Sequence, residues 1–187
     1  MDRFGRRSFV IGAALLPPLL LSQRAEATLM RGLPLRSMIA QSEHVVLLTG
    51  LDSRCLSISI AGRPTIVTEA RLRVEEVLTK QAPNGVELLV RSLGGVLDGV
   101  GELVHGQAEF ARDAQCLAFL SRAPDASLWV TGMAQGHYPI ATPTSAEALL
   151  SASPHLAALR DFEHSAVKSL VGQKLQQARR LIEESAR

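Results

Sequence analysis

The middle of the chain alternates between hydrophobic and polar residues in the way that β-strands do. Between residues 66 and 74 every second position holds Ile, Thr, Ala, Leu or Val, and from residue 69 onward Glu or Arg stands between them. Side chains on a strand point to alternate faces, so this stretch predicts a strand with one buried face and one charged face in solvent. Similar patterns predict strands over residues 44–60, 86–90, 102–110, 115–121 and 127–133, and an extended piece over 137–140. Short strands about ten residues apart are typical of a closed or nearly closed antiparallel barrel.

A short helix is expected before the first strand. Leu35, Met38 and Ile39 lie three and four positions apart, which places them on one helical face and predicts a helix over residues 33–43. This helix would precede the barrel, whose domain we expect to cover residues 28–142.

The chain changes character after Pro143, where Ala, Leu, Glu, Gln and Arg dominate. One or two helical turns are expected at Ala146–Leu150. A hydrophobic stripe from Leu170 to Ile182 then predicts a helix whose apolar face packs on the rest of the domain. The expected fold class is therefore mainly β, a small antiparallel barrel with a short N-terminal helix and a helical C-terminal segment, 143–187, packed on it.

The first 27 residues have the three zones of an export signal. A basic start is followed by a hydrophobic run, residues 9–21, which is too short to cross a bilayer as a helix. Ala25 and Ala27 then form the small-x-small pattern after which signal peptidase cleaves, so we expect the mature chain to begin at Thr28. The segment predicts export to the periplasm or to the outside of the cell.

A pair of arginines indicates the export route. Arg6 and Arg7, followed by Ser-Phe-Val, resemble the twin-arginine signal, whose cargo passes through its export machinery already folded. The segment differs from that signal at Gly5, where Ser or Thr is usual, and at Ile11, where Lys is frequent. A general secretory signal and an uncleaved anchor are the alternatives.

Composition excludes some function classes once the signal is set aside. Residues 28–187 carry 16 basic and 16 acidic residues, so the formal net charge of +2 for the whole chain falls to zero. With balanced charge and five aromatic side chains in this part, the sequence gives no basis for nucleic-acid binding. Hydrophobic residues make up 47% of the chain, which excludes a disordered protein, and no hydrophobic run is long enough for a transmembrane span in the mature chain.

Several short motifs between residues 42 and 140 carry a resemblance to a known kind of module. They are Ser-x-His-Val-Val from Ser42, Val-Thr-x-x-x-Leu-x-Val at 67–74, Gly94-Gly95, Gly106-x-Ala108-x-Phe110, Leu117-Ala118-Phe119-Leu120 and Gly132-x-x-Gln135-Gly136-x-Tyr138. This run resembles a module of uncharacterised exported bacterial proteins. Its layout of strands and glycines is also similar to netrin and tissue-metalloprotease-inhibitor modules, which implies an OB-like barrel. Those inhibitors act through a mature N-terminal cysteine, and Thr28 stands in that place here, so metalloprotease inhibition is not implied.

Glycines and histidines are the first candidates for chemistry. Residues 94–101 contain four glycines but neither the Gly-Lys-Ser/Thr ending of a P-loop nor the Gly-x-Gly-x-x-Gly spacing, so we expect them to serve turns and strand bends. The five histidines are dispersed, and none has the spacing of a helical zinc site. His105 and His137 could meet across strands, with Asp98 or Glu102 as a third metal ligand, although satisfied or surface histidines are the alternative.

Nucleophilic catalysis has no support in the sequence. No serine stands in a Gly-x-Ser-x-Gly elbow. Acidic residues that are adjacent in the sequence point in different directions on a helix and on a strand, so they cannot act as a general acid/base pair. We therefore expect no catalytic residues, no resident metal and no cofactor.

Cys55 and Cys116 are the two cysteines of the chain. An oxidising compartment would allow one bridge between them, and its closed loop would stabilise the fold by about 4 kcal/mol. Two unpaired buried thiols are the alternative. In the second case Cys116, which lies in a hydrophobic strand, would be inert.

Three functions remain open on this evidence. The leading hypothesis is an exported binding or accessory module that engages a protein or envelope partner. The alternatives are a hydrolase-like or metal-dependent enzyme using His105 and His137, and a small-molecule carrier using the barrel mouth. An exposed hydrophobic patch would favour the first, and a pocket with converging polar groups would favour the others.

Overall fold

The computed structural model describes residues 29–79, 85–141 and 147–187. The predicted export signal, with Arg6, Arg7, Ala25 and Ala27, lies outside the described residues, and so does the predicted boundary at 142/143. Within the described part the fold is mainly β, as the alternation of residues predicts, and its strands form one large sheet with two small ones beside it.

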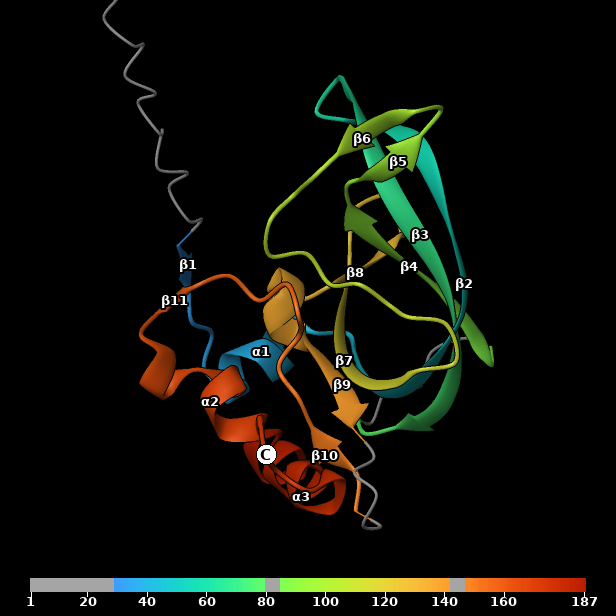
Figure 1. Ribbon diagram of the computed structural model, residues 1–187. Helices are drawn as coiled ribbons and strands as arrows, with labels where there is room; N and C mark the ends of the chain where they lie inside the picture. The colour runs from blue at the N-terminus through green and yellow to red at the C-terminus, as the bar shows by residue number, and fades with distance from the viewer. Residues whose placement is uncertain (1–28, 80–84, 142–146) are drawn as a thin grey trace, which may run out of the picture.

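Four strands form the centre of the large sheet (Figure 1). β2 (His44–Ile60) and β3 (Arg63–Val77) are a long antiparallel hairpin, β4 (Glu87–Leu93) pairs antiparallel with β3, and β7 (Gln115–Arg122) pairs antiparallel with β2. These are the strands whose alternation or apolar run is clearest in the sequence. Hydrophobic β-branched and aliphatic residues on at least one face give each of them a surface to bury.

Three shorter strands extend this sheet. β9 (His137–Ala141) and β10 (Leu149–Leu150) continue it beyond β7. β8 (Leu128–Val130) pairs antiparallel with β7 and parallel with β4, and therefore connects two strands that lie on opposite sides of the β2–β3 hairpin.

The long strand β2 stops pairing with β7 at Gly50 and continues with β3. Up to Thr49 it pairs with β7 on one side and β3 on the other, and beyond residue 50 the described residues pair it with β3. Register shifts at Leu47/Leu48 and Gly50/Asp52 mark bulges, which bend strands and increase their twist. A Cβ atom at Gly50 would lie 2.1 Å from the Ala111 carbonyl oxygen, so this crossing point requires glycine.

Hydrophobic side chains fill two cores, one on each face of the sheet. The first lies on the concave face between the curved strands and includes Val46, Leu48, Ala70, Leu72, Leu88, Val90, Cys116, Ala118 and Leu120. The second lies under the helices and includes Val45, Leu47, Leu117, Phe119, Tyr138, Ala166, Leu170, Ala178 and Ile182. Strand β7 contributes alternate residues to both cores, which explains why its sequence is apolar without alternation.

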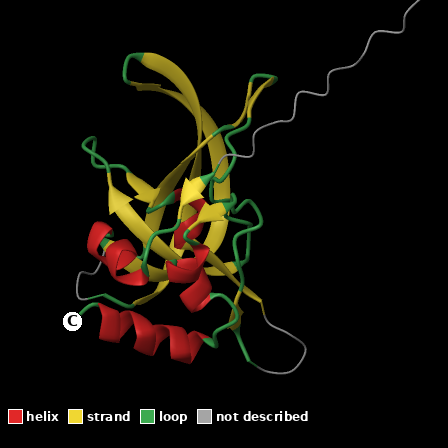
Figure 2. Ribbon diagram, turned by 90° about the vertical axis from the view of Figure 1, so that its left-hand side faces the viewer, coloured by secondary structure: helices red, strands yellow, loops and turns green. Residues whose placement is uncertain are grey.

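Three helices cover the second core and gather at one end of the molecule (Figure 2). They are α1 (Leu35–Gln41), α2 (Ala166–Leu170) and α3 (Leu175–Ser185). The short N-terminal helix is thus confirmed, whereas the predicted helix from Leu170 to Ile182 is interrupted at residues 171–174 between α2 and α3. Ala178 and Ile182 of that stripe are fully buried in the second core.

The remaining elements are short. β5 (Gly95–Leu97) and β6 (Val100–Glu102) form a small hairpin, and β1 (Met30–Arg31) pairs parallel with β11 (Leu159–Arg160). Two 3₁₀ turns, η1 (Met133–Gly136) and η2 (Phe162–His164), complete the described chain.

Two further local predictions are wrong. Residues 103–114 form a loop rather than the expected strand over 102–110, because Gly106 has a left-handed backbone (φ +81°) and turns the chain. Leu149 and Leu150 form strand β10 rather than a helical turn, because they pair with Ala141 and Ile140 and are hydrogen-bonded from the other side by residues 172–175. The C-terminal segment is therefore helical in α2 and α3 but not throughout.

Candidate functional site: a pocket on the concave face

A pocket of about 840 Å³ lies on the concave face of β2, β3 and β4. Its walls are Glu102 at the end of β6 with the loop 103–110 that follows, and the segment 154–158, which precedes β11. Figure 1 shows the chain after β6 running across the open side of the curved sheet. Segments that are far apart in the sequence therefore enclose one space.

The floor of the pocket is a row of three small polar side chains. Register places Cys55 of β2 opposite Thr68 of β3, and Thr68 opposite Ser92 of β4. All three line the pocket. Two residues further along β3 and β4, the same face carries Ala70 and Val90, which belong to the hydrophobic core. The concave face thus changes from hydrophobic to polar where the pocket begins.

The three polar side chains of the floor differ in their contacts. The Thr68 hydroxyl donates to the Gly94 carbonyl oxygen at 2.8 Å, and Cys55 Sγ lies 3.5 Å from Thr68 Oγ1. Ser92 is 8% exposed, and its hydroxyl has no hydrogen-bond partner among the described residues. Such a hydroxyl is available to a ligand or to water in the pocket.

Gly95 lets the β5–β6 hairpin approach the floor closely. A Cβ atom on this residue would lie 2.6 Å from both Cys55 Sγ and Thr68 Oγ1, and its φ of +133° also disfavours other residues. The structural role expected for this glycine is therefore confirmed.

Polar side chains also tie the pocket walls to the sheet and to each other. Glu109 Oε2 lies 2.6 Å from His155 Nε2, which links the two walls. Glu102 Oε2 accepts a hydrogen bond from the Ile66 amide at 3.0 Å, and Gln107 Oε1 accepts one from the Leu93 amide at 3.2 Å. These contacts hold the loop over the floor although it forms no strand there.

His105 and His137 lie in different environments. His105 lines the pocket, whereas His137 is 3% exposed, with Nδ1 3.2 Å from Ser153 Oγ and its ring edge-on to Phe110 at 4.8 Å between centroids. Burial lowers the pKa of His137 to about 4, so this ring is neutral at neutral pH. Within residues 29–79, 85–141 and 147–187 no three His, Cys, Asp or Glu side chains are grouped as metal ligands, so the alternative three-ligand site on His105 and His137 is not formed.

Of the two states that the sequence left open for the cysteines, the structure shows the unpaired one, because both thiols are free. Cys116 pairs with Leu48, and Cys55 lies seven residues further along β2. At about 3.3 Å per residue this separation far exceeds the reach of a disulfide. Burial raises the pKa of Cys116 to about 12, whereas Cys55 is half-buried and lines the pocket.

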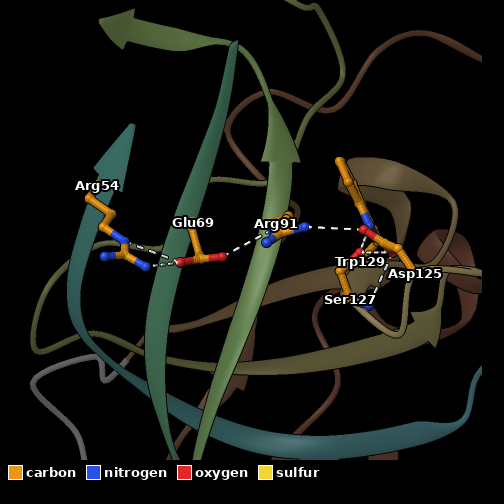
Figure 3. Close-up of polar contacts among 6 residues, drawn as sticks. All are labelled: Arg54, Glu69, Arg91, Asp125, Ser127 and Trp129. Atoms are coloured by element: carbon orange, nitrogen blue, oxygen red, sulfur yellow. Dashed lines mark hydrogen bonds and ion pairs between the residues drawn. The ribbon is translucent and has the colours of Figure 1, made fainter. Parts of the chain in front are cut away.

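Figure 3 shows a second polar row on the same three strands. Its residues are each next in sequence to a floor residue and therefore point to the opposite face of the sheet. Arg54, Glu69 and Arg91 are opposite one another on β2, β3 and β4. Glu69 Oε1 accepts from Arg54 Nη2 at 2.7 Å, and Glu69 Oε2 accepts from Arg91 Nε at 3.0 Å. The charged face of β3 was expected to be solvated, yet the Glu69 side chain is only 4% exposed because the two arginines cover it.

This outer row joins four strands. Arg91 also lies 3.3 Å from Asp125, whose other carboxylate oxygen accepts from the Ser127 hydroxyl, and Ser127 Oγ in turn accepts from Trp129 Nε1 at 2.7 Å. Hydrogen bonding to Arg54 is the main cause that lowers the pKa of Glu69. We interpret the row as a brace that holds the pocket floor rigid.

Comparison with known proteins gives no matching family model and no matching curated relative. Among the described helices, none has the length and hydrophobicity required to cross a membrane.

Proposed function

We propose that this chain is an exported binding module that holds a small ligand in the pocket on its concave face. The observation that carries the proposal is the polar row Cys55–Thr68–Ser92 beneath that pocket. Neighbouring positions of the same face are hydrophobic core, and the buried Ser92 hydroxyl of the row has no partner among the described residues, which costs free energy. A ligand that forms a hydrogen bond with the row would offset this cost.

The size and composition of the pocket support the proposal. Small-molecule sites usually measure roughly 300–1,000 Å³ and combine hydrophobic walls with a few placed polar groups. The hydrophobic part of the wall consists of Leu93, Val104, Phe110 and Leu156. Ser92 provides a hydroxyl without a partner among the described residues. Of the three functions left open by the sequence, this geometry favours the small-molecule carrier.

The strand pairings support an OB-like barrel as the finer description of the fold. β8 pairs with β7 and with β4, so the pairings β7–β2–β3–β4–β8 return to β7. In this description the pocket lies at one mouth of the barrel, and Phe110 separates it from the hydrophobic interior.

The proposal that the protein is exported rests on the sequence alone. The twin-arginine-like start, the hydrophobic run and the small-x-small pattern before Thr28 support export through the twin-arginine machinery to the periplasm or beyond the cell. Ligand binding would then take place outside the cytoplasm, where a protein or envelope partner could receive the ligand.

A probe molecule tests the binding site directly. We expect the neutral compound 4-phenylbutanol to shift the backbone amide NMR signals of Thr68, Ser92 and Gly95. Ser92→Phe should abolish these shifts by filling the pocket, whereas Leu89→Phe, on the outer face of the same strand, should leave them intact. Loss of binding in both variants, or shifts scattered over the surface, would count against the pocket.

A further inference from the structure

Among the Asp, Glu, Lys and Arg side chains of the chain, those in the described pocket lining are all acidic. Its lining includes the carboxylates Glu102 and Glu109 and, among the described residues, no Lys or Arg. The nearest arginines of the sheet, Arg54 and Arg91, are committed to Glu69 on the opposite face. We infer that the ligand is a small organic cation, an amine with a hydrophobic body, and this inference rests on the proposed function.

Each of the two carboxylates has one hydrogen-bond partner that orients it. Glu102 Oε2 is fixed by the Ile66 amide, which leaves Oε1 without a partner among the described residues. Glu109 is fixed by His155. Glu102 has no charged partner among the described residues and therefore supplies the negative charge of the lining. An ammonium group would therefore meet a preorganised acceptor, which limits the entropic cost of binding.

The hydrogen-bonding groups of the pocket also match a donor-rich ligand. An ammonium group has three donors and no acceptor. Carboxylate oxygens accept only, and the hydroxyl of Ser92 can accept as well. An anion such as a phosphate would instead face two carboxylates with no Lys or Arg among the described lining residues to offset them, which is unfavourable at close range.

The body of the ligand is expected to be hydrophobic. Leu93, Val104 and Leu156 line the pocket, and Leu103 stands at its rim with its side chain 78% exposed. Burial of hydrophobic surface on both partners favours association. The charge then selects the ligand class, and the hydrophobic walls supply the affinity.

Three probes with one skeleton separate these contributions. We expect 4-phenylbutylamine to bind the mature protein at least tenfold more tightly than 4-phenylbutanol, and 4-phenylbutyrate to bind more weakly than either, by titration calorimetry at low ionic strength. Glu102→Gln and Glu109→Gln should each weaken amine binding about fivefold and leave the alcohol unchanged. Glu183→Gln, on the exposed face of α3, is the matched control and should change neither.

The outcomes distinguish this inference from the proposed function. Equal binding of the amine and the alcohol, or tighter binding of the acid, overturns the cation inference and leaves the pocket as a binding site. Absence of binding by all three probes overturns both. An amine preference that survives both glutamate substitutions also overturns the inference, because the selectivity would then come from another part of the surface.

Discussion

His137 is a buried polar side chain whose protonation state affects the stability of the fold. Its ring packs edge-on to Phe110 and contacts Ser153, and burial lowers its pKa to about 4 from an ordinary value of 6.5; the nearby charge of Glu109 offsets only part of this shift. In the unfolded chain the ring binds a proton near pH 6.5, so the unfolded state holds more protons between these two values. Folding stability must therefore fall as the pH falls through this range.

We predict a loss of about 3 kcal/mol in the free energy of unfolding from this residue between pH 6.5 and pH 4. His137→Asn should be less stable at pH 7, since it loses the contact with Phe110, but its stability should fall less over the same range. His164→Gln, on an exposed turn, should retain the slope of the unaltered protein. Urea unfolding at several pH values measures these slopes, and identical slopes in His137→Asn and the unaltered protein would refute the assignment.

At the scale of elements, period-two patterning predicts the central strands well because each strand buries at least one face. It fails in the loop 103–114, where Leu103, Val104 and Ala108 resemble a strand although Gly106 turns the chain. It also misses the parallel pairing of β4 with β8, which involves two residue pairs and depends on tertiary packing rather than on local sequence.

The two faces of β3 give a matched test of the strand. Leu72 is fully buried in the concave core, so Leu72→Asp should cost several kcal/mol against a typical total of about 5–15 and should unfold the domain. Arg71, one position away, is 49% exposed in ion pairs with Asp52 and Glu87. Arg71→Gln should cost less than about 1 kcal/mol. Thermal melting compares the two, and equal tolerance would mean that the register is wrong.

The sheet register also explains why the site was only partly visible in the sequence. Thr68 belongs to the inward-facing set that the alternation identifies, and that assignment is correct. Its neighbours Cys55 and Ser92 are 13 and 24 residues away along the chain, and only the pairing of β2 and β4 with β3 brings them into one row. The alternation likewise predicts Glu69 as a solvated surface charge. Only the strand register shows that an arginine lies on either side of it.

At the scale of the whole molecule, the pocket depends on parts of the chain that no local pattern connects. Its floor comes from three strands, its near wall from the loop after β6, and its far wall from residues 154–158. The Glu109–His155 contact spans 46 residues. The brace of Arg54, Glu69 and Arg91 lies behind the floor, and the helices cover the opposite core. The molecule thus combines a cross-linked sheet with an open pocket that has a polar floor.

Cys55 offers the most direct measurement of the central claim, that this space binds a ligand over the polar floor. In the folded protein iodoacetamide should alkylate Cys55 and spare Cys116, whose thiol is buried and whose pKa is raised to about 12. Saturating 4-phenylbutylamine should slow the alkylation of Cys55 at least about fivefold, as followed by mass spectrometry, because it would cover the thiol. An unchanged alkylation rate at a probe concentration that saturates calorimetric binding would contradict the claim.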